Sequence, residues 1–196
     1  MNAISVGALR RASAAAAILT LGCGGAGSGS PGPAPEPALA GRALTEVFLL
    51  EAAGAIPDDT TISIDADAGR VVELRRPGPD YGLFARLTVP PPDSGVTRGP
   101  LQLTLRPRPG LYALDLEVQG TLGDGASIEF SYGMHFVAPA GARERYGGDL
   151  LFERELRLGR LDDSTRVVFL PTDRPGSDMV AGPVEGPGRY LVAAPR

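Results

Sequence analysis

The alternation of apolar and polar side chains is clearest between residues 111 and 139. Apolar residues take every second position on both sides of a turn-rich break at 120–125: Tyr112, Leu114, Leu116 and Val118, then Ile128, Phe130, Tyr132, Met134 and Phe136. A period of two places one set of side chains on a buried strand face and the other towards water. Two such runs joined by a glycine-rich loop predict a β-hairpin. Because an isolated hairpin is marginally stable in water, further strands must cover its apolar face.

The rest of the chain predicts more short strands separated by turns. Strand-like apolar patterns cover the stretches 60–66, 71–74, 83–89, 101–105, 166–170, 180–184 and 190–194. Glycine (27 residues) and proline (19 residues) recur between these stretches, as turns between short strands require.

Three stretches are less regular. Residues 44–52 fit either helical spacing or a compact buried strand, and we predict a strand because the following chain is strand-like. Residues 150–158 share one apolar parity that is broken at Arg154, which predicts a strand, with a short helix over 149–155 as the alternative. The stretch 139–148 is predicted to be a loop.

About nine or ten strands without strand–helix alternation predict an all-β fold, an antiparallel β-sandwich. The body from Arg42 to Arg196 resembles the Ig-like sandwich domains of bacterial cell-surface proteins, and the closing stretch 188–194 is similar to their final strand. This resemblance implies a role in attachment or binding rather than in catalysis.

Residues 1–22 have the features of an export signal. Arg10 and Arg11 give it a positive start, and the apolar run at 12–21 is too short to span a bilayer as a mature helix. Gly22 and Cys23 then follow, and together these features resemble bacterial lipoprotein signal peptides.

In lipoproteins of this kind a small residue precedes a cysteine that is lipidated and becomes the mature N-terminus. The resemblance therefore implies lipidation of Cys23, with the membrane as a partner and the bacterial cell envelope as the location, at the outer membrane or the periplasmic face. The leucine usual three positions before the cysteine is replaced by Thr20. A plain secretory signal with an incidental cysteine is the alternative.

The segment that follows, 23–41, carries the cysteine and a linker rich in glycine, serine and proline. Its composition cannot build a core, so we expect a disordered linker, flexible in its first half and stiffer in its second. We therefore place the folded domain at 42–196.

The charge and cysteine count exclude two classes of protein. The formal net charge is −4, which gives no electrostatic support for binding nucleic acid. Cys23 is the single cysteine, so no intramolecular disulfide can form. All 19 basic residues are arginine, which we attribute to genome composition rather than to function.

Residues suited to catalysis are scarce. The single histidine, His135, has the opposite parity to Met134 and Phe136, which predicts that it points away from the core face. No Gly-x-Ser-x-Gly motif surrounds a serine, so a Ser-His-Asp hydrolase lacks its parts. We predict no catalytic residue and no cofactor.

A calcium loop is also not predicted. Asp65 and Asp67 have the spacing of the first two ligands of a helix-flanked calcium loop. That loop needs a ligand at its fifth position, glycine at its sixth and glutamate at its twelfth, where this chain has Gly69, Arg70 and Arg76. We predict no metal site, and the alternative is a calcium site between loops that uses carbonyls and the turn residues Asp58, Asp59, Asp162 and Asp163.

Two tyrosines lie in stretches predicted to be loops, and they are the candidate binding residues. Tyr81 and Tyr146 are surrounded by glycine, proline and charged residues, and a loop tyrosine can stack on a sugar or anchor a protein contact. We predict a non-catalytic envelope lipoprotein whose sandwich has a structural or adhesive, protein-binding role. A carbohydrate-binding module is the alternative, for which both rings must be exposed on one face. An envelope hydrolase, with His135 in a cleft, is the third hypothesis.

Overall fold

The computed structural model describes residues 41–79 and 81–196. The predicted signal peptide, Cys23 and the linker up to residue 40 lie outside the described residues. The described chain forms an antiparallel all-β, sandwich-like fold, as the sequence predicts.

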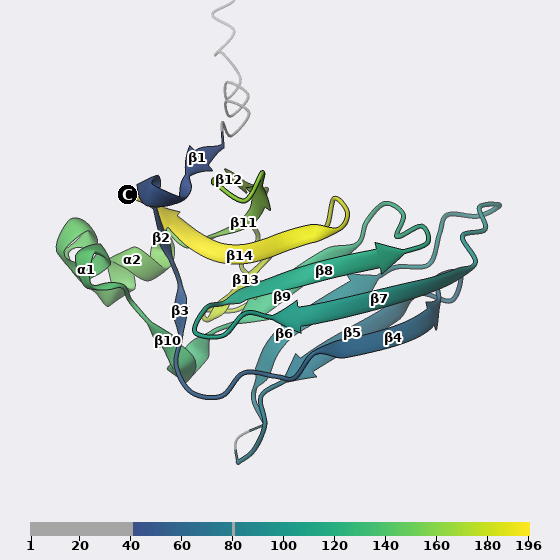
Figure 1. Ribbon diagram of the computed structural model, residues 1–196, viewed down its shortest axis with the longest axis horizontal. Coiled ribbons are helices and arrows are strands. Elements are labelled where there is room, and N and C mark those ends of the chain that lie inside the picture. The colour runs from purple at the N-terminus through teal and green to yellow at the C-terminus, as the bar shows by residue number, and fades with distance from the viewer. Residues whose placement is uncertain (1–40, 80) are drawn as a thin grey trace, which may run out of the picture. The chain divides into compact units, whose positions relative to one another are not determined.

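The larger sheet contains eight strands (Figure 1). Its spatial order is β1 (Arg42–Ala43), β12 (Arg166–Phe169), β11 (Arg157–Asp162), β14 (Gly188–Pro195), β8 (Ala113–Gln119), β7 (Pro100–Pro107) and β4 (Thr60–Asp65). The eighth strand, β2 (Val47–Leu49), pairs with residues 193–195 of β14, whose residues 188–191 pair with β8.

The smaller sheet has four strands. In order these are β13 (Met179–Pro183), β9 (Ser127–Ser131), β6 (Leu83–Val89) and β5 (Arg70–Arg75). A separate two-stranded pair joins β3 (Glu51–Ala52) to β10 (Phe136–Val137). The main core lies between the sheets, where Leu103 and Leu105 of β7 pack in one cluster with Ile128 and Phe130 of β9.

The predicted hairpin over 111–139 is wrong. β8 pairs with β7 and β14, whereas β9 pairs with β6 and β13, so the 120–125 loop carries the chain from one sheet to the other. Alternation shows that each strand has a buried face, but it does not identify the neighbouring strand. Here the two apolar faces contribute to one core between different sheets, and β9 ends at Ser131 rather than at Phe136.

Two short helices replace the predicted loop at 139–148 and the first part of the predicted strand at 150–158. Helix α1 (Ala140–Tyr146) ends at Gly147, which has the left-handed φ of 78° that favours glycine after a helix. Helix α2 (Asp149–Arg154) matches the alternative of a short helix over 149–155. The predicted strand at 44–52 is also interrupted, since the 3₁₀ helix η1 (Leu44–Glu46) precedes β2 and β3.

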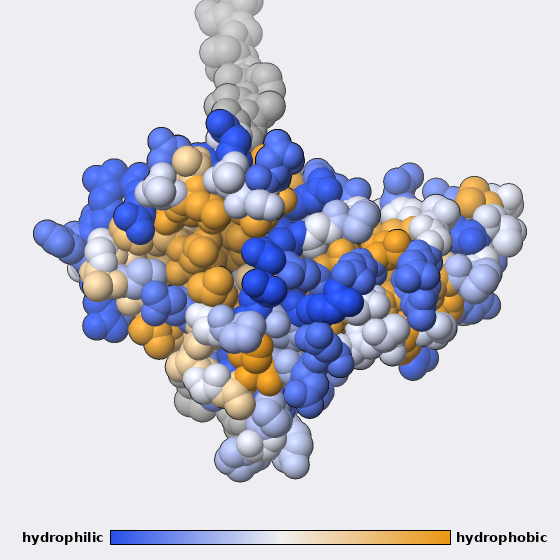
Figure 2. All heavy atoms as spheres, in the orientation of Figure 1, coloured by the Kyte–Doolittle hydropathy of each residue, from blue (hydrophilic) through white to orange (hydrophobic). Residues whose placement is uncertain are grey.

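The large sheet is apolar on its outer face at one end. A second buried cluster lies there, made of Val47, Ala113, Val167, Phe169, Leu191 and Ala193. The cluster packs tightly because Gly159 has no side chain. A Cβ at this position would approach Val167 to 2.6 Å and Leu191 to 3.2 Å. Figure 2 shows this apolar area over β2, β11 and β14, with hydrophilic residues beside it over β7 and β8.

Candidate functional site

Tyr81 lies in the loop that joins β5 to β6, and its side chain is 65% exposed. Its φ of 45° is unusual for a bulky residue, since it lies in the left-handed region. Two contacts hold this conformation. The Arg75 guanidinium donates to the Tyr81 carbonyl at 3.3 Å, and the ring lies so close to Gly78 that a Cβ there would approach Cζ to 3.0 Å.

Tyr146, the other candidate, ends helix α1 and is half-buried. Its ring packs against Phe48 and Phe152, with centroid distances of 6.3 and 5.8 Å, and its hydroxyl donates to the carbonyl of Pro195. Burial raises the pKa of the Tyr146 hydroxyl. These contacts make Tyr146 an anchor that joins the helices to the C-terminus.

The structure therefore places the two candidate tyrosines in different settings. The Tyr81 ring is presented to solvent on a strand–strand loop, whereas the Tyr146 ring packs against the core on a helix. Of this pair, Tyr81 alone offers a free ring face for stacking or for insertion into a partner.

A buried arginine that the sequence interpretation missed supports the Tyr81 loop. Arg76 follows β5 and is 2% exposed, and its N–H closes the loop by donating to the Gly82 carbonyl at 2.9 Å. Its guanidinium donates to the carbonyls of Ala53 (3.0 Å) and Ala55 (2.8 Å) and to the hydroxyl of Tyr112 (2.8 Å).

Aromatic rings complete the surroundings of this cation. The guanidinium carbon of Arg76 lies 5.4 Å from the ring centroids of both Phe84 and Tyr112, a distance at which cation–π attraction operates. Within the described chain Arg76 makes no ion pair with a carboxylate, and its Nε has no hydrogen-bond partner. One signal was present in the sequence, because Arg76 has the parity of the buried Val72 and Leu74.

Hydrogen bonds continue from Arg76 to the helices through two buried tyrosines. The Tyr112 hydroxyl donates to the Tyr132 carbonyl at 2.9 Å, and the two rings meet edge to face at 6.3 Å. The Tyr132 hydroxyl in turn accepts from Arg174 at 3.3 Å. Burial raises the pKa of Tyr112 and of Tyr132 to about 12, so both hydroxyls stay protonated at neutral pH.

Arg174 completes this connection at helix α2. One of its terminal nitrogens lies 2.7–2.9 Å from the carbonyl oxygens of Glu153, Arg154 and Leu156, at the C-terminal end of the helix. A cation at this end satisfies carbonyls that have no partner within the helix. We call the connected set Arg76, Tyr112, Tyr132 and Arg174 the tyrosine–arginine network; it joins the base of the Tyr81 loop to the end of α2.

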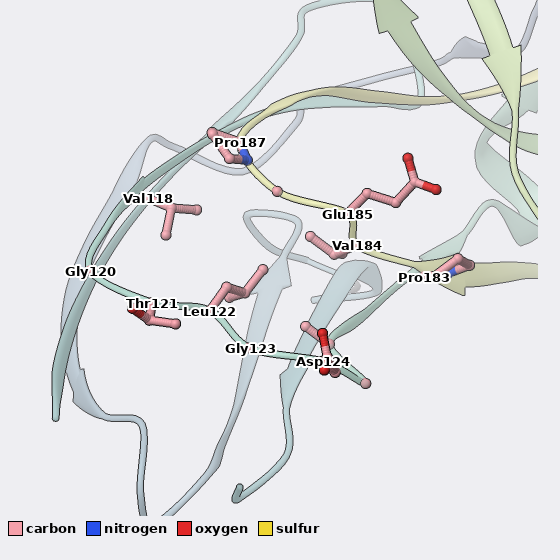
Figure 3. Close-up of a pocket in the computed structure, with 13 residues that line it drawn as sticks. Val118, Gly120, Thr121, Leu122, Gly123, Asp124, Pro183, Val184, Glu185 and Pro187 are labelled. Carbon is pink, nitrogen blue, oxygen red and sulfur yellow. The ribbon is translucent and has the colours of Figure 1, made fainter. Parts of the chain in front are cut away.

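A separate pocket of about 710 Å³ lies between the 120–126 and 183–187 loops (Figure 3). Leu122 and Val184 point towards one another across it, whereas the Glu185 carboxylate points away. The Tyr190 hydroxyl fixes one wall, because it accepts from the N–H groups of Glu185 (3.0 Å) and Gly186 (3.2 Å). The lining combines Leu122 and Val184 with glycines and the acidic residues Asp124 and Glu185, and it includes neither His135 nor Tyr81.

His135 lies at the end of the 3₁₀ helix η2 (Gly133–His135), not on a strand as predicted. It is half-exposed, and its carbonyl accepts a hydrogen bond from the Ala53 N–H at 2.7 Å. In the ranges 41–79 and 81–196, no three His, Cys, Asp or Glu side chains cluster as metal ligands would. In the same residues, no helix has the length and apolar character needed to cross a membrane.

Comparison with known proteins adds no relative. No family model matches the chain, and neither the curated proteins nor the solved structures include a significant match. The site residues must therefore be interpreted from their geometry.

Proposed function

We propose that this protein is a non-catalytic lipoprotein of the bacterial cell envelope whose β-sandwich domain binds a partner protein through the Tyr81 loop. The observation that carries the proposal is the exposed Tyr81 ring on a backbone that other residues hold in a left-handed conformation. Strained, over-determined backbone is concentrated at binding and active sites. Tyrosine is enriched among the residues that dominate binding energy at protein interfaces.

The described residues at both ends of the loop are held in place, which favours binding. Its ends are joined by the Arg76 N–H bond to Gly82, and its Tyr81 carbonyl is held by Arg75. Residues held in this way lose little conformational entropy when a partner binds, so more of the contact energy appears as affinity. A glycan-binding surface has less support, because stacking platforms usually offer more than one ring and Tyr146 is packed against the core.

The partner proposal is tested by capture from envelope extract with the full chain as bait. The variant is Tyr81→Asn, which removes the ring and tolerates the left-handed backbone. The matched control is Val96→Ala, at an apolar residue that is 55% exposed in another loop. We expect wild type and Val96→Ala to retain a common protein that Tyr81→Asn loses. Equal capture by all three would contradict the role of Tyr81.

The lipid anchor is tested separately. Wild-type protein from cells should partition into the detergent phase, and Cys23→Ser should remain in the aqueous phase. Equal partitioning would remove the anchor from the proposal and leave the binding loop standing.

The non-catalytic assignment has its own test, a screen for esterase, peptidase and glycosidase activity. We expect no turnover above that of a denatured sample. Turnover that is lost in His135→Ala would replace the binding role with a hydrolase.

A further inference from the structure

Helix α2 exposes two adjacent leucines. Leu150 is 63% exposed and Leu151 is 47% exposed, while Phe152, the next residue, is fully buried. Exposure of one leucine is ordinary, but two neighbours on the first turn of a helix form an exposed apolar edge.

The leucines cannot turn inwards, because the helix is fixed from several sides. Phe152 packs edge-on against Phe48 at 6.3 Å, and Arg174 holds the carbonyls at the end of α2. At the start of α2, Asp149 accepts a hydrogen bond from Arg143 of α1 at 2.6 Å. The apolar edge is therefore presented outwards by the fold itself.

This edge lies near the point where the chain enters the domain. Phe48, which contacts both α1 and α2, lies six positions after Arg42, the first residue of β1. The Arg196 N–H donates to the Glu46 carbonyl at 2.8 Å, which brings the C-terminus to the same end. Figure 1 shows β1, the C-terminus and both helices at this end of the domain.

We propose that Leu150 and Leu151 insert into the surface of the lipid bilayer that holds the acylated Cys23, and so orient the domain on it. The inference rests on the lipid anchor of the proposed function. With a flexible first half and an extended, proline-rich second half, a chain the length of 24–41 spans roughly 30–45 Å, which keeps the entry point of the domain within reach of the bilayer. An apolar edge beside that point meets the bilayer at a high effective concentration.

The charges around the edge fit a bilayer surface. Arg143, Arg145 and Arg154 alternate along the two helices with acidic residues. Such a balanced set can lie among lipid headgroups without repulsion, while adjacent leucines enter the boundary of the acyl chains. Leu150 and Leu151 bring no polar group that must find a partner there.

The absence of tryptophan from the chain allows a direct test with single tryptophan reporters. The variants are Leu150→Trp and, as the matched control, Val96→Trp, each in the full chain purified from membranes. Both are reconstituted in phosphatidylethanolamine–phosphatidylglycerol vesicles whose acyl chains carry bromine, which quenches a fluorophore inserted among them. We expect the reporter at 150 to lose at least half of its emission, and the reporter at 96 to keep its emission.

Each other outcome overturns the inference in a distinguishable way. Equal emission from the two reporters, in protein that floats with the vesicles, would remove the leucine contact and leave the anchor standing. Wild-type protein that does not float would remove the anchor and this inference together. A concentration-dependent blue shift at 150 without vesicles would assign the edge to protein contact instead.

Discussion

The Tyr81 loop and the α1–α2 helical pair are both exposed and both held from behind by an arginine, but they are held differently. Arg76, behind the loop, is buried, and it donates to the carbonyls of Ala53 and Ala55. Arg174, behind the helices, is exposed, and the helices are also fixed by packed rings. One buried side chain therefore anchors the chain where the loop begins, and Arg75 holds the Tyr81 carbonyl, whereas the helices share their support among packed rings and an exposed arginine.

The largest expected effect follows from this difference. Arg76→Met keeps the apolar stem but leaves the part-buried carbonyls of Ala53 and Ala55 and the buried Tyr112 hydroxyl without their donor. We expect unfolding to become easier by about 3 kcal/mol. Urea denaturation measures the loss, and Arg70→Met, at an exposed arginine of β5, is the control, with no expected change. A loss below about 1 kcal/mol for Arg76→Met would show that the buried guanidinium is not a main anchor of the fold.

Alkaline pH should lower the free energy of unfolding through Tyr112 and Tyr132, the two tyrosines that connect the regions. Because the folded pKa of Tyr112 and of Tyr132 is raised to about 12 from 10.0, their contribution is fully present below pH 10 and is lost as pH rises through 12. At pH 11 the expected loss is about 1–1.5 kcal/mol for each tyrosine. Urea denaturation of wild type at pH 9 and pH 11 measures it, and unchanged stability would contradict these pKa values.

Arg174→Met should lower the free energy of unfolding by less than Arg76→Met does. The substitution removes the donor at the end of α2, but the carbonyls there can be reached by water. We expect a loss of about 1–2 kcal/mol. Hydrogen exchange should rise in α2 and remain unchanged in β5. An equal loss of stability in the two arginine variants would show that the two regions do not differ in their dependence on an arginine.

The smallest effect is expected for Tyr146→Phe, which keeps the ring and removes the hydrogen bond to Pro195. We expect a loss of about 1 kcal/mol with packing unchanged. Thermal unfolding measures it. A loss of about 3 kcal/mol or more would show that the hydroxyl, rather than the ring, fixes the helices to the C-terminus.

The sequence predicts the strands best where one face is buried and the other meets water. In β7, Leu101, Leu103 and Leu105 are buried and alternate with exposed or half-exposed residues, so the strand is visible from its period. The pairing of strands is not local information, which is why β8 and β9 were predicted to form a hairpin and instead lie in different sheets. The prediction of an antiparallel all-β class is confirmed despite this error. It requires that the chain form antiparallel strands, and it does not require knowing which strands are neighbours.

The site was predicted less well than the fold. The composition of the surrounding residues made Tyr81 and Tyr146 equally good candidates for binding. Which of them is exposed depends on tertiary contacts, which composition does not reveal. Residues 149–155 fit both a strand and a helix pattern in sequence. Leu150 is exposed although it shares the parity of the buried Phe152, as expected for helix α2 and not for a strand with one buried face. Arg76 was missed because a charged residue is expected at the surface unless its partners are known.

Photo-crosslinking in intact cells tests the central claim, that the Tyr81 loop meets protein while the helical pair meets lipid. A photoreactive phenylalanine analogue is placed at 81, at 150 or, as the control, at 96. We expect a discrete protein adduct from position 81 and none from positions 150 and 96. A protein adduct from position 150 with none from position 81 would contradict it.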